Sequence, residues 1–457
     1  MRWKATDDRR VSTIQLELHM RGQPRDLTTQ LAVIGSGMAG FAASIFAVNR
    51  NITTTLVGNA GALAYTTGYL DLLGRLDGSP AAVTDPWQAL ENLRETQTRH
   101  PLSRIAITDI RRSIDEFAAF LGEAGMTYSR PGKHNITALT PIGTLKQTCC
   151  VPATMAAGPR ALAARTPCVI VDFEGLKGFS GRQVLANLME RWPGLTTQRI
   201  VFPGMAPGEV YPEVMARALE VPATREKLAA TLKSAAGQAK VIGLPAILGM
   251  HCPDQVHSEL ERLTELEIFE IPTMPPSVPG LRLRELLEQV LPKKGLAMIP
   301  QHKVTALTFD EDGATLALSD SFGPIRIHAQ TVILATGRFL SGGLEAHPDG
   351  ISEHLLNLPV TQPAGRAGWY RDRYTDIRGH PIHRTGIEVN AAFRPLGPDG
   401  QPCHLRLFVA GVILAHQDWI RSRSGAGIAI ATAYKAVAEV ERHLTGQKTQ
   451  LRQPTKS

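Results

Sequence analysis

Three closely spaced glycines carry the clearest chemical signal in the chain: Gly35, Gly37 and Gly40. They follow the apolar run 31–34, which predicts a strand, and precede the small-residue stretch 38–49, which predicts a helix. This order is typical of a βαβ unit that binds the phosphates of a nucleotide or a flavin. The first glycine permits the tight turn, the second lets a phosphate approach the backbone, and the third lets the helix pack on the sheet. The alternative is a glycine-rich turn in an ordinary α/β domain.

Two later strands are also expected to end in glycine. The apolar segments 331–334 and 405–410 lead to Gly337 and Gly411. Ligands of open parallel sheets bind at the carboxyl ends of the strands. We therefore expect both glycines to lie beside Gly35 around one elongated ligand.

A second glycine pair, Gly425 and Gly427, precedes a long helix predicted over 428–443. The positive end of this helix dipole is expected to face a flavin ring and to stabilise negative charge on its reduced form. An ordinary helix start is the alternative.

The second predicted strand, 53–57, lacks the residue that usually holds an adenosine ribose. An Asp or Glu is expected about 20 residues after the first glycine. Here the strand runs into Gly58 and Asn59 instead. The missing carboxylate favours FMN over FAD or NAD, or a FAD site with altered anchoring.

The elements around these glycines indicate an α/β fold of the FAD/NAD(P)-binding, Rossmann-like flavoprotein class with a large inserted α/β domain. Residues 31–75 and 281–457 are expected to form a discontinuous flavin-binding domain, because glycine-terminated strands occur in both. Residues 76–280 are expected to be an inserted domain that contacts substrate or partners, and 1–30 a flexible N-terminal extension. Helices are predicted at 105–125, 181–192 and 281–291, strands at 168–173, 241–248, 296–299, 304–309, 315–318 and 325–327, and a non-helical proline-rich crossing at 272–280.

Composition narrows the function classes. The net charge is +7, but the basic residues are scattered and only 5% of residues are aromatic, which disfavours single-stranded nucleic-acid binding. The five cysteines lack zinc or iron–sulfur spacing, so no metal site is expected. No apolar stretch reaches the roughly 18–20 residues of a membrane span, and no signal peptide is visible. A cytoplasmic protein without a transmembrane span is expected.

Over nearly all of 31–440 the chain resembles the B-subunit family of anaerobic glycerol-3-phosphate dehydrogenase. Two uncommon strings carry much of this resemblance, PTMPPSVPG at 272–280 and FLSGGL at 339–344. The other segments are LAVIGSGMAG, TTGYLDLLG, TPIGTLKQT and LFVAGVILA.

The resemblance implies an FMN-dependent flavoprotein within a three-subunit complex of anaerobic respiration. Such a complex oxidises glycerol 3-phosphate to dihydroxyacetone phosphate and passes electrons through iron–sulfur clusters to quinone. The implied partners are a FAD-dependent A subunit, together with a C subunit that carries the clusters and contacts the membrane. The chain would then lie at the inner face of the membrane through these partners.

The resemblance also assigns flavin contacts by position. The first glycine cluster is expected at the flavin phosphate region, together with Gly411. Thr66, Thr67 and Gly68 are expected beside the isoalloxazine ring, and Thr336 and Gly337 beside the ribityl chain.

The chain departs from the family pattern before its last helix, where it has Arg421 and Arg423. These arginines are expected to clamp a phosphate or carboxylate of the substrate; solvated or partner-contacting side chains are the alternative. His416 is the local choice for a catalytic base. Two rival functions are a non-catalytic assembly subunit with a degenerate flavin fold, and a stand-alone flavin oxidoreductase acting on another small acid.

Overall fold

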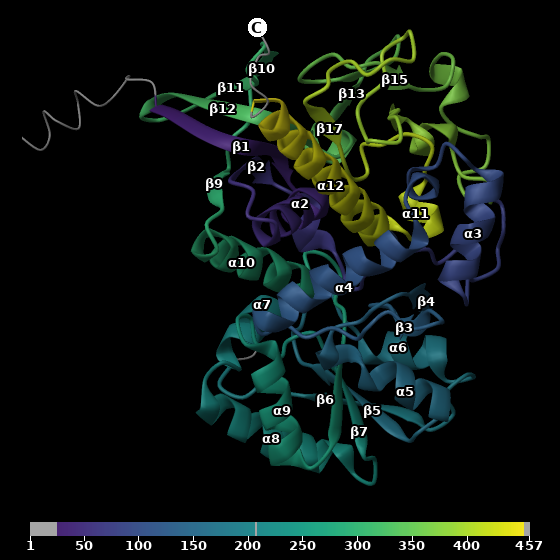
Figure 1. The fold of residues 1–457 in the computed structure, drawn as a ribbon. Coiled ribbons are helices and arrows are strands. Elements are labelled where there is room, and N and C mark those ends of the chain that lie inside the picture. Colours follow the sequence, from purple (N-terminus) through teal and green to yellow (C-terminus); the bar gives the residue numbers. More distant parts are fainter. Residues whose placement is uncertain (1–24, 206–207, 452–457) are drawn as a thin grey trace, which may run out of the picture.

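The computed structural model describes residues 25–205 and 208–451 (Figure 1). The predicted extension lies outside the described residues as far as residue 24. From Arg25 onward the chain is already part of β1, because Arg25–Thr29 pair with Ile325–Ala329 of β12. The first strand therefore starts before Leu31, the predicted position.

In the described residues, a seven-stranded sheet forms the centre of the upper half of Figure 1. Its order is β10-β11-β12-β1-β2-β9, and β17 pairs with β12. The pairs β12–β1, β1–β2, β2–β9 and β12–β17 are parallel, whereas β10, β11 and β12 form an antiparallel meander. The strands are β1 (Arg25–Ser36), β2 (Thr54–Ala60), β9 (Ala297–Pro300), β10 (Ala306–Phe309), β11 (Ala314–Asp320), β12 (Gly323–Leu334) and β17 (Leu407–Val409).

The long strand β12 unites two predicted pieces, 325–327 and 331–334, with the residues between them. Its first part alternates buried and exposed residues, because it has one solvated face. Its last four residues, 331–334, are all buried. All four pair with β1 and the last three also pair with β17, so β12 holds two sheet neighbours at the edge where the predicted site lies.

A second sheet, β6-β5-β7-β8, is entirely parallel and lies in the lower half of Figure 1. β5 has the predicted bounds, and all six of its residues are buried, as expected of a strand covered on both faces. The elements of this region are β3 (Ile136–Leu139), β4 (Leu145–Thr148), α5 (Ala157–Ala164), β5 (Cys168–Phe173), α6 (Gly181–Leu188), β6 (Leu195–Ile200), α7 (Pro212–Ala218), α8 (Pro222–Ala236), β7 (Val241–Pro245), α9 (Pro253–Thr264) and β8 (Glu267–Ile271).

Two helices from the region expected to be inserted, 76–280, pack instead with the first sheet. Phe117 of α4 (Ile107–Glu123) and Leu90 of α3 (Pro86–Thr96) belong to the same buried cluster as Phe41. α4 contacts α12 (Gly425–Leu451) and α2 (Met38–Asn49). It crosses the molecule between its two halves (Figure 1). We therefore propose that the insertion begins after α4, since an amphipathic pattern predicts a buried face but not the core that it joins.

The proline-rich tract 272–280 also differs from its prediction at its end. α10 (Val278–Lys293) already includes Pro279 and Gly280. Proline is tolerated in the first turn of a helix, because the N–H that it lacks has no helical acceptor there. The helix therefore begins earlier than the predicted Leu281.

The remaining elements are spread along the described chain, and α12 is the long helix among them. They are mostly short and join the segments around the sheet edge. They are η1 (Ala62–Tyr65), η2 (Pro101–Arg104), η3 (Ala153–Met155), η4 (Phe339–Ser341), β13 (Leu344–Ala346), β14 (Ile351–Glu353), β15 (Val360–Thr361), η5 (Arg366–Gly368), η6 (Pro381–Arg384), β16 (Gly386–Ile387), α11 (Trp419–Ser422) and α12 (Gly425–Leu451).

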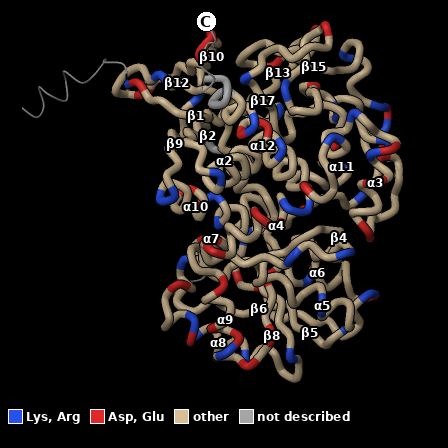
Figure 2. Tube along the Cα trace, in the orientation of Figure 1, with Lys and Arg blue, Asp and Glu red and all other residues tan. Residues whose placement is uncertain are grey.

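Charged residues of both signs are interspersed along the trace (Figure 2). Lys and Arg do not gather on one element of the described chain in this view, which matches the scattered pattern in the sequence.

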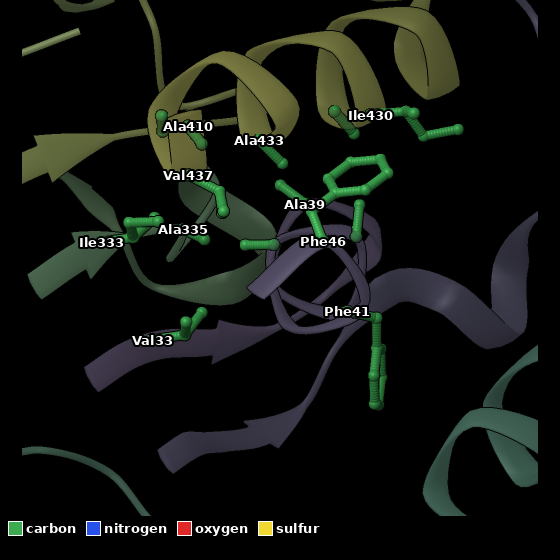
Figure 3. Close-up of a cluster of buried hydrophobic side chains, with 14 of the residues drawn as sticks. Val33, Ala39, Phe41, Phe46, Ile333, Ala335, Ala410, Ile430, Ala433 and Val437 are labelled. Atoms are coloured by element: carbon green, nitrogen blue, oxygen red, sulfur yellow. The ribbon is translucent and has the colours of Figure 1, made fainter. Parts of the chain in front are cut away.

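α2 (Met38–Asn49) lies between the large sheet and α12 (Figure 3). Its small residues, Ala39 among them, allow close approach of α12, where Ala433 and Val437 face it (Figure 3). Farther along, the rings of Phe46 and Tyr434 meet edge-to-face with centroids 5.2 Å apart. This layer fixes the direction of α2 and with it the glycine turn at its start.

Candidate functional site

The first glycine turn has one open position between two crowded ones. Gly35 has φ +117°, and a Cβ there would clash with the Ala335 carbonyl. A Cβ at Gly40 would clash with the Gly35 carbonyl, because the helix packs directly on the turn. Around Gly37, by contrast, nothing lies within 4 Å of the corresponding position. The backbone is therefore accessible at Gly37, where a phosphate approach is predicted.

The N-terminus of α2 is also free of internal caps. Gly37 is its N-cap residue, no side chain caps the helix there, and its first turn contains no acidic residue. The first N–H groups of a helix have no helical acceptor, and the helix dipole favours an anion beside them. The combination is that of a phosphate site at a helix start.

Three strand ends meet at this turn. The carbonyl of Ile34 accepts from Ala335 N at 2.8 Å, and the carbonyl of Leu334 accepts from Ala410 N at 3.0 Å. The glycines that follow, Gly35, Gly337 and Gly411, therefore lie at one edge of the sheet. Gly337 and Gly411 have φ values of +71° and +87°, so each of these turns favours glycine.

Gly411 brings the last strand against the first helix. A Cβ at Gly411 would lie 2.6 Å from Cβ of Ala39, in the first turn of α2. The Gly411 N–H donates to Oγ1 of Thr432 in α12 at 2.8 Å. The turn is thus held between two helices and lies close to the open position at Gly37.

The segment Thr66–Gly68 is positioned by the proline-rich tract. The hydroxyl of Ser277 donates to the Thr66 carbonyl. Gly68 has φ +83°, and a Cβ there would lie 2.7 Å from Cβ of Pro279. On the other side, the Tyr128 hydroxyl donates to the Gly68 carbonyl at 2.7 Å. The string PTMPPSVPG therefore shapes the segment expected beside the flavin ring.

Two threonine hydroxyls in the predicted site lack partners. Oγ1 of Thr66 and Oγ1 of Thr336 are buried and make no hydrogen bond within the described chain. A buried unpaired hydroxyl costs free energy, and native proteins rarely leave one without a function. Both residues are among the predicted flavin contacts, and polar atoms of a bound flavin would satisfy them.

The end of β2 lies directly on the glycine turn. Ser36 pairs with Ala60 after a register shift, and the Ser36 hydroxyl donates to the Asn59 carbonyl. A Cβ at Gly61 would lie 2.8 Å from Cα of Gly37. This segment carries no carboxylate, so an adenosine ribose would have to be held by other groups.

Gly425 and Gly427 serve close packing. A Cβ at Gly427 would lie 2.8 Å from Cα of Leu72, and the Gly427 N–H donates to the Asp71 carbonyl at 2.7 Å. A Cβ at Gly425 would lie 3.0 Å from the Trp419 ring. One N–H predicted to face the flavin is therefore used by Asp71, and the dipole effect stays a prediction.

The structure does not bring Arg421 and Arg423 together as one clamp. Arg421 Nη2 donates to the Tyr374 carbonyl at 3.2 Å, and its side chain lies against Gly379. Arg423 lies against Gly74 instead. The two side chains diverge because Arg423 has φ +49°, which reverses the chain after α11.

His416 follows β17 in the sequence and lies beside an acidic residue, Glu388. Its Nε2 is 3.5 Å from Oε2 of Glu388. Burial and the nearby Arg99 lower the pKa of His416, and Glu388 opposes them without reversing the shift. A neutral imidazole is able to accept a proton, so the role of base stays a prediction.

Two other positively charged side chains near the site, those of Arg338 and Lys146, bind other groups of the protein. Arg338, directly after Gly337, donates to the carbonyls of His383, Leu414 and Gln417. Lys146 is 2.5 Å from Oδ2 of Asp71. Arg338 thus ties the predicted flavin edge to the segments around 383 and 416, a link that the sequence does not reveal.

Beyond that link lies a pocket of about 510 Å³ that the sequence analysis missed. Five arginines between 366 and 384 are the sequence signal that points to it. The lining residues are Asp77, Gly78, Thr361, Gln362, Pro363, Arg371, Arg378, Gly379, His380, Pro381, Arg384, Thr385 and His416.

Comparison with known proteins identifies the family. The model of the family described as "FAD binding domain" matches residues 30–428. The B subunit of anaerobic glycerol-3-phosphate dehydrogenase from Vibrio vulnificus strain CMCP6 is 30% identical over 424 residues, 90% of this chain and 96% of that protein. The chain belongs to this B-subunit family and carries its FAD binding domain. It is therefore a flavoprotein of an oxidoreductase family, and the predicted resemblance and fold class are confirmed.

A more distant relative bears the same subunit name. The probable B subunit of anaerobic glycerol-3-phosphate dehydrogenase from Halobacterium salinarum strain R1 is 27% identical over 428 residues, 90% of this chain and 97% of that protein. A flavocytochrome c3 fumarate reductase structure aligns with a TM-score of 0.40 at 10% identity, covering 96% of this chain and 82% of that one. This structural likeness is too distant to bear on the site. Among the described residues, no helix is long and apolar enough to cross a membrane.

Proposed function

We propose that the chain is the flavin-bearing B subunit of an anaerobic glycerol-3-phosphate dehydrogenase. With its partners it oxidises sn-glycerol 3-phosphate to dihydroxyacetone phosphate and relays electrons towards iron–sulfur clusters and quinone. The names of its relatives support this proposal, as does the agreement in length between the chain and those relatives. We propose as partners a FAD-dependent A subunit, together with an iron–sulfur C subunit that holds the complex at the membrane.

The observation that carries the flavin assignment is the open backbone at Gly37 among three aligned strand ends. The uncapped start of α2 would bind a flavin phosphate through backbone N–H groups. Thr66 and Thr336 would each supply a hydroxyl that has no partner inside the protein. These residues bind and orient the cofactor, and the flavin supplies the capacity to accept two electrons and release them singly.

We propose FAD as the flavin. The preference for FMN rested on the missing carboxylate at the end of β2 and on the family resemblance, and the family description, which names FAD, does not support it. Asn59 and the backbone around Gly61 occupy the place of the usual acidic residue. A ribose contact through amide or backbone groups is consistent with both observations.

The test is to purify the chain with its partners, to release the flavin of each separated polypeptide by heat and to identify it by mass. FAD on this chain, and bleaching of its absorbance by anaerobic sn-glycerol 3-phosphate, are expected. A chain without flavin in an active complex would contradict the proposal and favour the alternative of a non-catalytic assembly role. Reduction of the isolated chain by the substrate at the full rate would favour a stand-alone oxidoreductase.

A further inference from the structure

The pocket beside His416 combines three arginines with one aspartate. Arg371, Arg378 and Arg384 line it, together with Asp77. The segments that form it come from three parts of the chain: the loop after Gly74, the stretch 361–385 and the segment after β17. The three arginines come from one stretch of the sequence, and the fold places Asp77 and His416 beside them.

The three arginines differ in how far their guanidinium groups are paired within the protein. Arg378 makes two hydrogen bonds with the Asp376 carboxylate, at 2.9 and 2.7 Å, and Arg384 lies 2.9 Å from Oδ2 of Asp77. Arg371 Nε donates to the Gly379 carbonyl at 3.0 Å. Among the described residues, no carboxylate oxygen lies within ion-pair distance of Arg371. Its remaining guanidinium donors are available to an anion.

Thr385, which also lines the pocket, has a buried hydroxyl. Thr385 is only 1% exposed, and its Oγ1 makes no hydrogen bond within the described chain. Native proteins rarely leave a buried hydroxyl without a partner, and a ligand atom in the pocket would complete its hydrogen bonding. This observation is independent of the charges.

We propose that this pocket binds the phosphate group of a small phosphate monoester, through Arg371 and Thr385. Guanidinium groups bind phosphate oxygens by charge-assisted hydrogen bonds, and a threonine hydroxyl adds a neutral one. Among the described residues that line the pocket there is no Phe, Tyr or Trp, the side chains that offer the largest stacking surface to a flavin or a nucleotide base. The choice of phosphate over carboxylate rests on the proposed function.

The pocket is mechanically linked to the predicted flavin site. Arg338 follows Gly337 at that site and binds the carbonyl of His383, which directly precedes Arg384. The same guanidinium binds the carbonyls of Leu414 and Gln417, on either side of His416. Occupation of the pocket would therefore act on a segment that the flavin edge also positions.

The test is equilibrium binding by calorimetry, with the full chain carrying its bound flavin and with sn-glycerol 3-phosphate, inorganic phosphate and glycerol as separate ligands. The monoester is expected to bind and glycerol is not. Tighter binding of the monoester than of inorganic phosphate identifies the monoester as the ligand, and equal affinity identifies free phosphate. No binding of either anion overturns the proposal.

Two variants locate the binding. Arg371→Gln is expected to weaken binding by about tenfold or more, because it removes a charge-assisted contact. Thr385→Val is expected to weaken binding about fivefold while the thermal midpoint without ligand stays the same or rises, because the hydroxyl has no partner to lose. Arg373→Gln is the matched control, since Arg373 is exposed on the same loop and does not line the pocket.

Unchanged affinity in both variants overturns the proposal, even if the wild-type chain binds the monoester. The visible spectrum separates this result from a failure of the proposed function. A flavin-loaded chain that binds no phosphate contradicts only the pocket assignment, whereas a wild-type chain without flavin contradicts only the proposed function.

Discussion

Arg282 and Glu270 form a doubly hydrogen-bonded ion pair deep inside the protein, at 2.6 and 2.7 Å. Their side chains are 1% and 0% exposed. Arg282 lies on α10, which leads back to the large sheet, and Glu270 lies on the last strand of the inserted sheet. The carboxylate also accepts from Leu248 N and from the Thr154 hydroxyl. The pair therefore joins the two sheets through one desolvated contact.

We expect Arg282→Met to lower the free energy of unfolding by ~3–5 kcal/mol, because it leaves a buried carboxylate without its cation. The double variant Arg282→Met with Glu270→Leu is expected to be more stable than Arg282→Met alone, since no charge is then buried. Urea unfolding followed by circular dichroism measures both. Arg284→Met is the control on the same helix, and a cost as large as that of Arg282→Met would contradict the argument.

The same pair makes the stability of the folded protein depend on pH under acidic conditions. Burial raises the pKa of Glu270, but Arg282 and the hydrogen bonds outweigh it and hold the pKa below its ordinary value of 4.5. The pair therefore contributes its stability above pH 4.5, and this contribution is lost as the pH falls through the lower folded-state value. We expect Glu270→Gln to flatten the fall in thermal midpoint below pH 4.5. An equally steep fall in the variant would assign the acid sensitivity to other groups.

His100 makes the stability of the folded protein depend on pH in a second range. Burial, with the nearby Arg384 and His416, lowers its pKa to about 3. The unfolded chain binds a proton below about pH 6.5 and the folded chain does not, so stability falls as the pH drops from 6.5 towards 3. Between pH 7 and pH 5, the free energy of unfolding of His100→Asn is expected to fall by ~2 kcal/mol less than that of the wild type. Urea unfolding at the two pH values measures this difference. His328→Asn, at an exposed position, should keep the wild-type slope.

Gly37→Ala tests the predicted phosphate approach. The added methyl group meets no protein atom, so the circular dichroism spectrum is expected to stay that of the wild type. Flavin content per chain is expected to fall about tenfold or more, because the methyl group would occupy the space of a phosphate. Gly122→Ala, at an equally open position in α4, should keep its flavin. Full flavin content in Gly37→Ala would refute this site.

Thr336→Val tests the unpartnered hydroxyl. Without flavin, the thermal midpoint is expected to stay unchanged, because no protein hydrogen bond is lost. Flavin affinity is expected to fall about fivefold, the worth of one hydrogen bond. Thr432→Val is the contrasting variant: its hydroxyl accepts from Gly411 N, so its loss should lower the midpoint itself. Unchanged flavin affinity in Thr336→Val would show that this hydroxyl does not contact the cofactor.

The sequence patterns predicted those parts of the fold that depend on neighbouring residues alone. α2 has the predicted bounds, Met38–Asn49, because glycine and small residues define its start and its packing face. Gly35 and Gly337 were recognised because positive φ leaves few alternatives to glycine. The alignment of the strand ends then follows from the parallel sheet.

Contacts between distant segments were not predictable in this way. Arg338 is one residue beyond a recognised motif, yet its three carbonyl partners lie 45 to 79 positions away. Arg421 and Arg423 differ in direction because of one left-handed residue, which no periodicity reveals. Thr385 looks ordinary in the sequence, and only its burial without a partner distinguishes it.

The placement of β17 and α12 has a consequence for synthesis on the ribosome. β12 takes β17 as a neighbour and α2 takes α12, so the first βαβ unit is completed by the final part of the chain. During translation the apolar surface of α2 is uncovered until those residues emerge. Domains generally fold as units, and exposed apolar surface invites aggregation in the meantime. This half of the protein therefore completes its core only once residues 407–451 are available, and truncation before residue 407 removes both covering elements together.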